Sequence, residues 1–213
     1  MKFKVGVVLN DLSEECLYKV MLPYGDPSVI GVSGDKLKYF VFQSITSEYI
    51  DKYKNEIKNR RKIYQKVYFK LRFPTFDVYM RKYCHEVKNF YANDYGYWDN
   101  PNAHWDYYIS GGVGNKILLV DDSVEITRSE YFDWDNDTKR LINPTGYKWV
   151  NHCKIKDIAF NKIKELDNFK LCGIIDDFGW HEFSGDNLLD EFKKYIRENV
   201  DNNNHLIIVE CHF

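Results

Sequence analysis

Residues 3–9, Phe-Lys-Val-Gly-Val-Val-Leu, decide the fold of this chain. Apolar residues occupy every second position from Phe3 to Leu9, which is the period of a β-strand with one buried face. Residues 205–211 contain a short continuous apolar run and predict a second strand near the other end. Because a helical pattern lies beside each of these strands, we expect the terminal strands to meet in one antiparallel or mixed sheet.

The remaining periodicity predicts an α+β fold, with a mostly antiparallel sheet and helices packed on one face. We expect one domain over residues 1–213, with a helical insertion at about 46–90. An acidic loop or hairpin is expected at 121–139. Asp186 is a candidate N-cap for the helix expected at 187–199. The other predicted elements are strands at 37–43, 116–120 and 169–175, a strand or turn at 178–183, and helices at 12–20, 75–89, 155–167 and 187–199.

Residues 47–72 predict one long basic helix. Apolar residues such as Tyr53, Tyr64 and Leu71 recur there at steps of three and four, which indicates a helix with a buried face. Nine Lys or Arg face only two acidic residues within 51–72. Pro74 should end the helix, because its ring clashes with the preceding turn and it lacks an N–H group.

The composition excludes several classes of protein. A net charge of −2 gives no general attraction to nucleic acid or to anionic membranes. No apolar run approaches the roughly 18 residues that a membrane span needs, and the first residues do not predict a signal peptide. The five Cys are odd in number and widely spread, so we expect reduced thiols and a cytoplasmic location.

Residues 97–112, the aromatic segment, are the most unusual part of the chain. They combine aromatic residues, Asn, Asp and His with a terminal Gly-Gly pair. One interpretation is a pocket wall, in which aromatic side chains of the segment stack on a planar ligand while His104 and Asp106 bind its polar edge. The other is a structural corner, in which Trp105 lies in the core. On an extended strand, Trp105 would share a face with Tyr107 and not with Tyr108.

The aromatic segment also resembles a known motif. Asn100-Pro101-Asn102-Ala103, followed by Trp105-Asp106-Tyr107-Tyr108 and Gly111-Gly112, is similar to the "NPNAKWDWY-x-x-GGRW" signature of an uncharacterised family of bacteriophages, prophages and bacteria. Val5 to Val8, Pro23-Tyr24, Phe178 to His181 and the "VVDCHI"-like end at 208–213 match as well. The resemblance implies a phage-type accessory protein, and the family carries no activity to transfer.

Two departures from this motif remove charge. His104 replaces the Lys of the family signature, and Val113-Gly114 replaces its Arg-Trp. An anion held by that Lys and Arg would find neither fixed charge in this chain. The glycines at 111, 112 and 114 lack the spacing of a phosphate-binding loop and precede a strand, so a turn is the favoured interpretation.

We expect no metal and no cofactor. Three Cys–His neighbours occur, namely Cys84-His85, His152-Cys153 and Cys211-His212, but neighbouring residues on a strand point to opposite faces. A hydrolase of small nucleotide or phosphodiester substrates is the alternative function. It would use His104, Asp106 and His181, with Asp176-Asp177 nearby. An enzyme is the less favoured hypothesis, because no nucleophile motif is present.

The favoured hypothesis is a non-enzymatic binder in the cytoplasm of a host bacterium. Its partner would be a host protein, bound to counter a host defence, or a nucleotide-like small molecule that it sequesters. We expect no membrane partner. Nucleic acid is a further alternative through the cations of the 52–72 helix, which otherwise form a solvated face. The candidate ligand-binding residues are Asn100, Asn102, His104, Trp105, Asp106, Tyr108, Gly111 and Gly112, and the candidate nucleic-acid or partner-binding residues are Arg60, Arg61 and Lys62.

Overall fold

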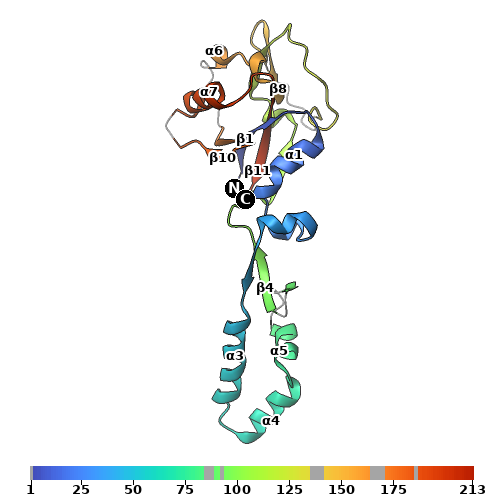
Figure 1. The fold of residues 1–213 in the computed structure, drawn as a ribbon, viewed down its shortest axis with the longest axis vertical. Helices are drawn as coiled ribbons and strands as arrows, with labels where there is room; N and C mark the ends of the chain where they lie inside the picture. The colour runs from blue at the N-terminus through green and yellow to red at the C-terminus, as the bar shows by residue number, and fades with distance from the viewer. Residues whose placement is uncertain (1, 84–88, 92–93, 135–141, 164–170, 185–186) are drawn as a thin grey trace. The chain divides into compact units, whose positions relative to one another are not determined.

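The computed structural model describes residues 2–83, 89–91, 94–134, 142–163, 171–184 and 187–213 and has an α+β fold (Figure 1). The chain divides into two compact units. The first unit contains Met1–Ile30 and Asn102–Phe213, and the second contains Gly31–Pro101. The helical segment expected at about 46–90 therefore lies within the second unit, which extends beyond it at both ends.

The first unit is built on a six-stranded sheet in which the terminal strands are neighbours. Strand β1 (Lys2–Leu9) pairs antiparallel with β11 (His205–His212), from Lys2 opposite His212 to Leu9 opposite His205. This confirms the predicted meeting of the terminal strands. The sheet order is β10-β9-β1-β11-β5, with β8 also pairing with β11. Strand β1 is parallel to β9 and the other pairings are antiparallel.

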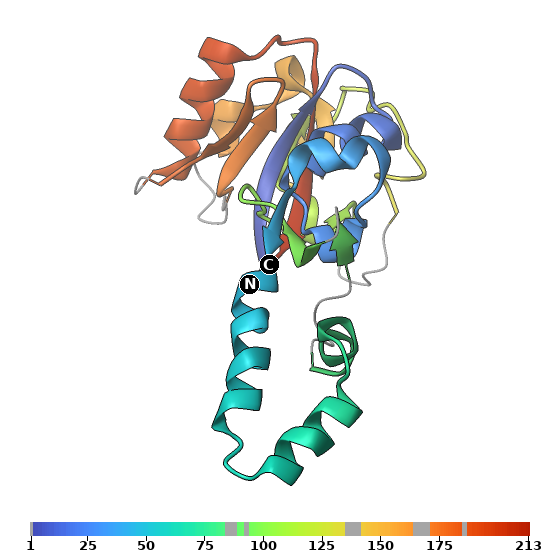
Figure 2. The same ribbon diagram turned by 60° about the horizontal axis from the view of Figure 1, so that its bottom comes forward.

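Helices cover both faces of this sheet, so the prediction of one covered face was wrong (Figure 2). Helix α1 (Glu14–Met21) packs Leu17 and Met21 on the face that carries Val5 and Val7 of β1. Helix α7 (Leu188–Asn199) packs on the opposite face, which carries Val8. The cause is the continuous apolar run in β11: residues 206–209 are all fully buried, as in a strand that is covered on both sides.

The other elements of the first unit mostly follow the predicted order. Ser13 caps α1 and Asn187 caps α7; Asp186, the cap that the sequence suggested, lies outside the described residues. Of the helix expected at 155–167, residues 164–167 lie outside the described residues, and the described part is a short 3-10 turn followed by α6. The bounds are η1 (Leu22–Tyr24), α2 (Pro27–Ile30), β5 (Tyr107–Ser110), η3 (Val113–Asn115), β6 (Leu118–Asp121), β7 (Tyr147–Val150), β8 (His152–Lys154), η4 (Ile155–Asp157), α6 (Phe160–Ile163), β9 (Gly173–Asp176) and β10 (Gly179–Glu182).

The second unit has its own small sheet and its own aromatic core. Its helices pack around a cluster formed by Phe69, Phe73, Tyr79 and Met80, against which Tyr53 also packs. The sheet order is β2-β4-β3. The bounds are η2 (Gly34–Tyr39), β2 (Val41–Ser44), α3 (Thr46–Asn59), α4 (Ile63–Arg72), α5 (Phe76–Tyr83), β3 (Asn89–Tyr91) and β4 (Asp94–Asp99).

The single helix predicted over 47–72 is in fact two helices, α3 and α4. The chain is extended at Arg60 and at Lys62, with ψ angles of 110° and 137°. The rings of Tyr53 and Phe69 lie 5.7 Å apart. In one straight helix these residues, sixteen positions apart, would be separated by about 24 Å along the axis. The break is therefore what allows the core of the second unit to close. Helix α4 ends just before Pro74, as predicted.

Candidate partner-binding surface

The aromatic segment is mainly a structural corner. Trp105 is 3% exposed, and its indole N–H donates to the Met21 carbonyl at 3.1 Å. Gly25 lies against this indole so closely that an added Cβ would be 2.7 Å from the ring. Tyr108 packs edge-on against Trp105 with ring centroids 5.0 Å apart, and burial raises the pKa of the Tyr108 phenol. The predicted strand alternation was wrong here, because β5 begins only at Tyr107.

The other candidate ligand-binding residues also serve the backbone or are divided between the units. The Asp106 carboxylate accepts from the Tyr107 N–H at 2.7 Å. Gly111 has a φ of +85°, and an added Cβ would meet the Phe132 carbonyl oxygen at 2.7 Å. Gly112 has a φ of +79° and donates its N–H to the Trp134 carbonyl. Asn100 is buried in the second unit, whereas Asn102 is exposed in the first.

His104 and His181 are not brought together in the structure. The His104 ring stacks on Trp180, with centroids 4.2 Å apart and planes at 8°. Burial lowers the pKa of His104, and the charge of Glu182 opposes this. Since Trp180 and His181 are neighbours on β10, their side chains leave opposite faces of the strand. The trio of His104, Asp106 and His181 that the hydrolase hypothesis requires is therefore not assembled.

His181 belongs instead to a network around Asp176. The buried Asp176 carboxylate lies 3.2 Å from His181 Nε2 and accepts from the Tyr195 hydroxyl at 2.7 Å. It also accepts the Phe178 N–H at 2.8 Å, which closes the turn between β9 and β10. Burial raises the pKa of Tyr195, and the bond to the Asp176 charge raises it further. These contacts tie β10 to α7, which is a structural role.

Arg60, Arg61 and Lys62 lie at the break between α3 and α4. The Arg60 guanidinium pairs with Glu56 at 2.8 Å and lies 4.6 Å from the centroid of Phe69. Arg60 is thus committed to packing, whereas Arg61 and Lys62 are exposed. Of the three predicted binding cations, two are available to a partner.

Helix α4 carries an exposed apolar surface that the periodicity had assigned to the core. Five side chains leave one side of the helix, because their positions follow steps of one, three and four residues. Leu71 is 77% exposed, and the hollow along this side has a volume of about 850 Å³. The buried Phe69 leaves the opposite side. We call this surface the α4 apolar face; it consists of Ile63, Tyr64, Val67, Tyr68 and Leu71.

Positive charge surrounds the α4 apolar face. On a helical projection, Lys66 and Lys70 flank it on one side and Arg72 flanks it on the other. The sequence contains no Asp or Glu between residues 57 and 76. The surface is therefore apolar at its centre and basic at its rim.

No family model, no curated protein and no solved structure matches this chain. Within the described residues, no helix has the length and the apolar character to cross a membrane.

Proposed function

We propose that this chain is a non-enzymatic binder of another protein, and that the partner covers the α4 apolar face. The observation that supports this proposal is the exposure of five large apolar side chains on one helix face. Contiguous apolar patches of this kind mark protein interaction sites on soluble proteins. Full burial of such side chains stabilises by about 1.5–3 kcal/mol each. The five are between 51% and 81% exposed, so burial of their exposed parts supplies a driving force on the order of 5–10 kcal/mol before the cost of association.

The partner that fits this surface has an apolar groove with an acidic rim. An amphipathic helix that docks by one face into a groove is a recurring mode of recognition. The cations Lys66, Lys70 and Arg72 would meet carboxylates at the rim, which favours rapid association with an acidic partner. A second copy fits less well, because a two-fold contact through this face would bring the same cations together.

The resemblance to a phage and prophage family suggests the biological setting. In that setting the partner is a protein of the host bacterium, bound inside the cell, and the outcome is interference with a host defence. The support for this part of the proposal is the motif in the aromatic segment and at the chain ends.

The test compares two aspartate variants, each of which replaces one exposed apolar residue. Leu71→Asp changes the α4 apolar face, and Phe178→Asp changes a side chain that is 79% exposed in the first unit. Tagged proteins are purified from the host, retained proteins are identified by mass spectrometry, and the affinity of the purified partner is measured. We expect Leu71→Asp to raise the Kd on the order of 30-fold or more, as for a central interface residue, and Phe178→Asp to leave it unchanged.

Three results would contradict the proposal. One is equal retention of the partner by the two variants. Another is a dimer in light scattering that Leu71→Asp converts to a monomer, which would make a second copy the occupant. The third is binding of anionic vesicles or of DNA through this face with no protein partner.

A further inference from the structure

Strand β10 forms one edge of the six-stranded sheet and lies beside helix α7 (Figure 1). Within the parts of the chain that the structure describes, β10 pairs with β9 on one side and with no strand on the other. A hollow with a volume of about 430 Å³ lies between the strand and the helix. It is lined by residues 181–183 at the end of the strand and by five residues on one side of α7.

The hollow runs along the free edge of β10. Successive side chains of a strand leave opposite faces of the sheet, so a hollow that touches residues 181, 182 and 183 in turn lies at the edge and not on one face. The Phe183 N–H donates to the Cys172 carbonyl at 2.8 Å, towards β9. Because backbone groups in an antiparallel pair alternate in direction, the N–H and C=O of Glu182 point away from β9. Glu182 thus offers one donor and one acceptor to an additional strand.

The two walls of the hollow are tied together by Asp176. Its buried carboxylate accepts from the Tyr195 hydroxyl of α7 at 2.7 Å and lies 3.2 Å from Nε2 of His181 on β10. The rings of His181 and Tyr195 also contact each other, with centroids 4.6 Å apart. Because the walls are already held in place, a partner that enters the hollow pays little for ordering them, which favours binding.

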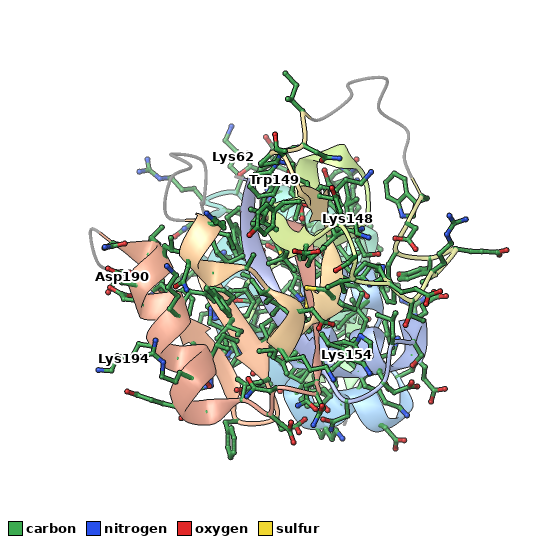
Figure 3. All side chains as sticks on the ribbon, turned by 90° about the horizontal axis from the view of Figure 1, so that it is seen from above. Lys62, Lys148, Trp149, Lys154, Asp190 and Lys194 are labelled. Carbon is green, nitrogen blue, oxygen red and sulfur yellow. The ribbon has the colours of Figure 1, made fainter. Side chains whose placement is uncertain are left out.

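The side chains that line the hollow carry an excess of negative charge. They include Glu182, Glu191 and Glu198. Lys194, which is labelled in Figure 3, is the one Lys or Arg among the lining residues. Glu191 also accepts the Ser184 N–H at 3.2 Å, whereas the other two carboxylates are on exposed residues. An occupant with Lys or Arg side chains therefore complements the hollow, and an acidic occupant is repelled.

We propose that an extended, positively charged peptide segment of a partner protein binds in this hollow as an added strand beside β10. Main-chain hydrogen bonds to Glu182 hold the segment to the sheet edge, and its Lys or Arg side chains meet Glu182 and Glu198. Addition of a strand to a sheet edge is a recurring mode of peptide recognition. A second copy fits less well, because two-fold pairing through β10 would bring the same carboxylates together. No residue of the α4 apolar face lines the hollow, so this proposal does not depend on the proposed function.

Calorimetric titration of the full chain with three blocked peptides tests the proposal. The probe alternates Lys and Val over about six residues, the usual length of a strand. The first comparison peptide has Glu in place of each Lys. The second keeps the Lys–Val sequence but is methylated on every backbone nitrogen, which preserves the charges and removes the N–H donors. We expect the probe to bind about tenfold more tightly, or better, than either comparison peptide, because only the probe has both the charges and the N–H donors.

Variants of the chain identify the surface that the peptide occupies. Glu182→Gln and Glu198→Gln each remove one carboxylate of the hollow, and each should weaken binding of the probe by about twofold to fivefold, as for an exposed ion pair. The matched control is Glu130→Gln, which removes an exposed carboxylate of the first unit that does not line the hollow. In NMR spectra, the Glu182 amide proton should exchange rapidly in the unbound protein and become protected when the probe is bound.

Equal affinity for the probe and its methylated form would overturn the proposal, because charge alone would then account for binding. An equal effect of the three Glu→Gln changes would place the peptide elsewhere on the chain. The same conclusion would follow from a Glu182 amide that stays unprotected in the complex. Protection of that amide in a dimer without peptide would make a second copy the occupant, and absence of binding by the probe would also overturn the proposal.

Discussion

At the scale of single residues, the same side chain types that suggest a ligand site instead build a corner. Trp105, His104 and Asp106 make their closest contacts with neighbouring protein groups: the Met21 carbonyl, the Trp180 ring and the Tyr107 N–H. The sequence showed that the composition of this segment is unusual. It could not distinguish the two interpretations, because an indole that packs in a core and one that stacks on a ligand have the same neighbours in sequence.

The contact between Gly25 and Trp105 gives a first prediction. Gly25→Ala should lower the free energy of unfolding by about 1–3 kcal/mol, because the added methyl would meet an indole that its hydrogen bond holds in place. Gly114→Ala is the control, since an added Cβ there contacts nothing within 4 Å. Urea denaturation of both variants measures the difference, and equal midpoints would show that Trp105 can move aside.

The buried thiols give a second prediction. Burial raises the pKa of Cys211 to about 12, and the charge of Glu210 contributes. Because a raised pKa keeps the thiol protonated at pH 8, Cys211 should resist a thiol-specific reagent in the folded protein and react once the protein is unfolded. Cys16, which is partly exposed, should react in both states. Peptide mapping by mass spectrometry identifies the labelled residues; rapid labelling of Cys211 in native protein would contradict the buried environment.

At the scale of elements, apolar periodicity predicted the two terminal strands well and the middle of the chain less well, since residues 37–39 of the strand expected at 37–43 belong to the 3-10 helix η2 and β4, β7 and β8 were not predicted. Strands β1 and β11 and helix α7 were predicted because their patterns are local. The break between α3 and α4 depends on the contact of Tyr53 with Phe69, which periodicity over a short window does not contain. The exposure of the α4 apolar face was missed for another reason: an apolar stripe has the same spacing whether its own chain or a partner covers it.

The link between β10 and α7 gives a third prediction. Tyr195→Phe should lower stability by about 1–2 kcal/mol, because the buried Asp176 loses its hydrogen bond from the phenol. Tyr68→Phe should have almost no effect, since the side chain of Tyr68 is 65% exposed. Thermal and urea unfolding provide the comparison. A Tyr195→Phe protein as stable as the unchanged chain would show that His181 and the Phe178 N–H suffice for Asp176.

At the scale of the whole molecule, the two units have separate cores. The apolar clusters on the two faces of the sheet belong to the first unit, and the aromatic cluster around Phe69 belongs to the second. The sequence predicted an α+β chain with a helical segment in its middle. It did not predict a second core, because that core assembles from α3, α4 and α5 only after the break at Arg60 brings them together.

The separate cores give a fourth prediction. Tyr53→Ala removes a ring that contacts Phe69 and Tyr79 and a hydroxyl that donates to the Phe73 carbonyl at 3.0 Å. We expect a loss of about 3–5 kcal/mol within the second unit. Hydrogen exchange should then accelerate in α3 and α4 and remain slow in β1 and β11. Equal acceleration in those strands would mean that the units unfold together.

The α4 apolar face also has a genetic consequence. All five of its side chains come from nine consecutive residues of one helix, so the recognition chemistry that we propose for it is encoded locally and not assembled from distant parts of the gene. Exposed positions tolerate substitution with little effect on stability, so mutation can alter the chemistry of this face while the cores remain intact. A short isolated helix is barely stable in water, so the same nine residues transferred to a host would need a helical scaffold. On such a scaffold, selection or design could transfer these nine residues and change their sequence as a single unit.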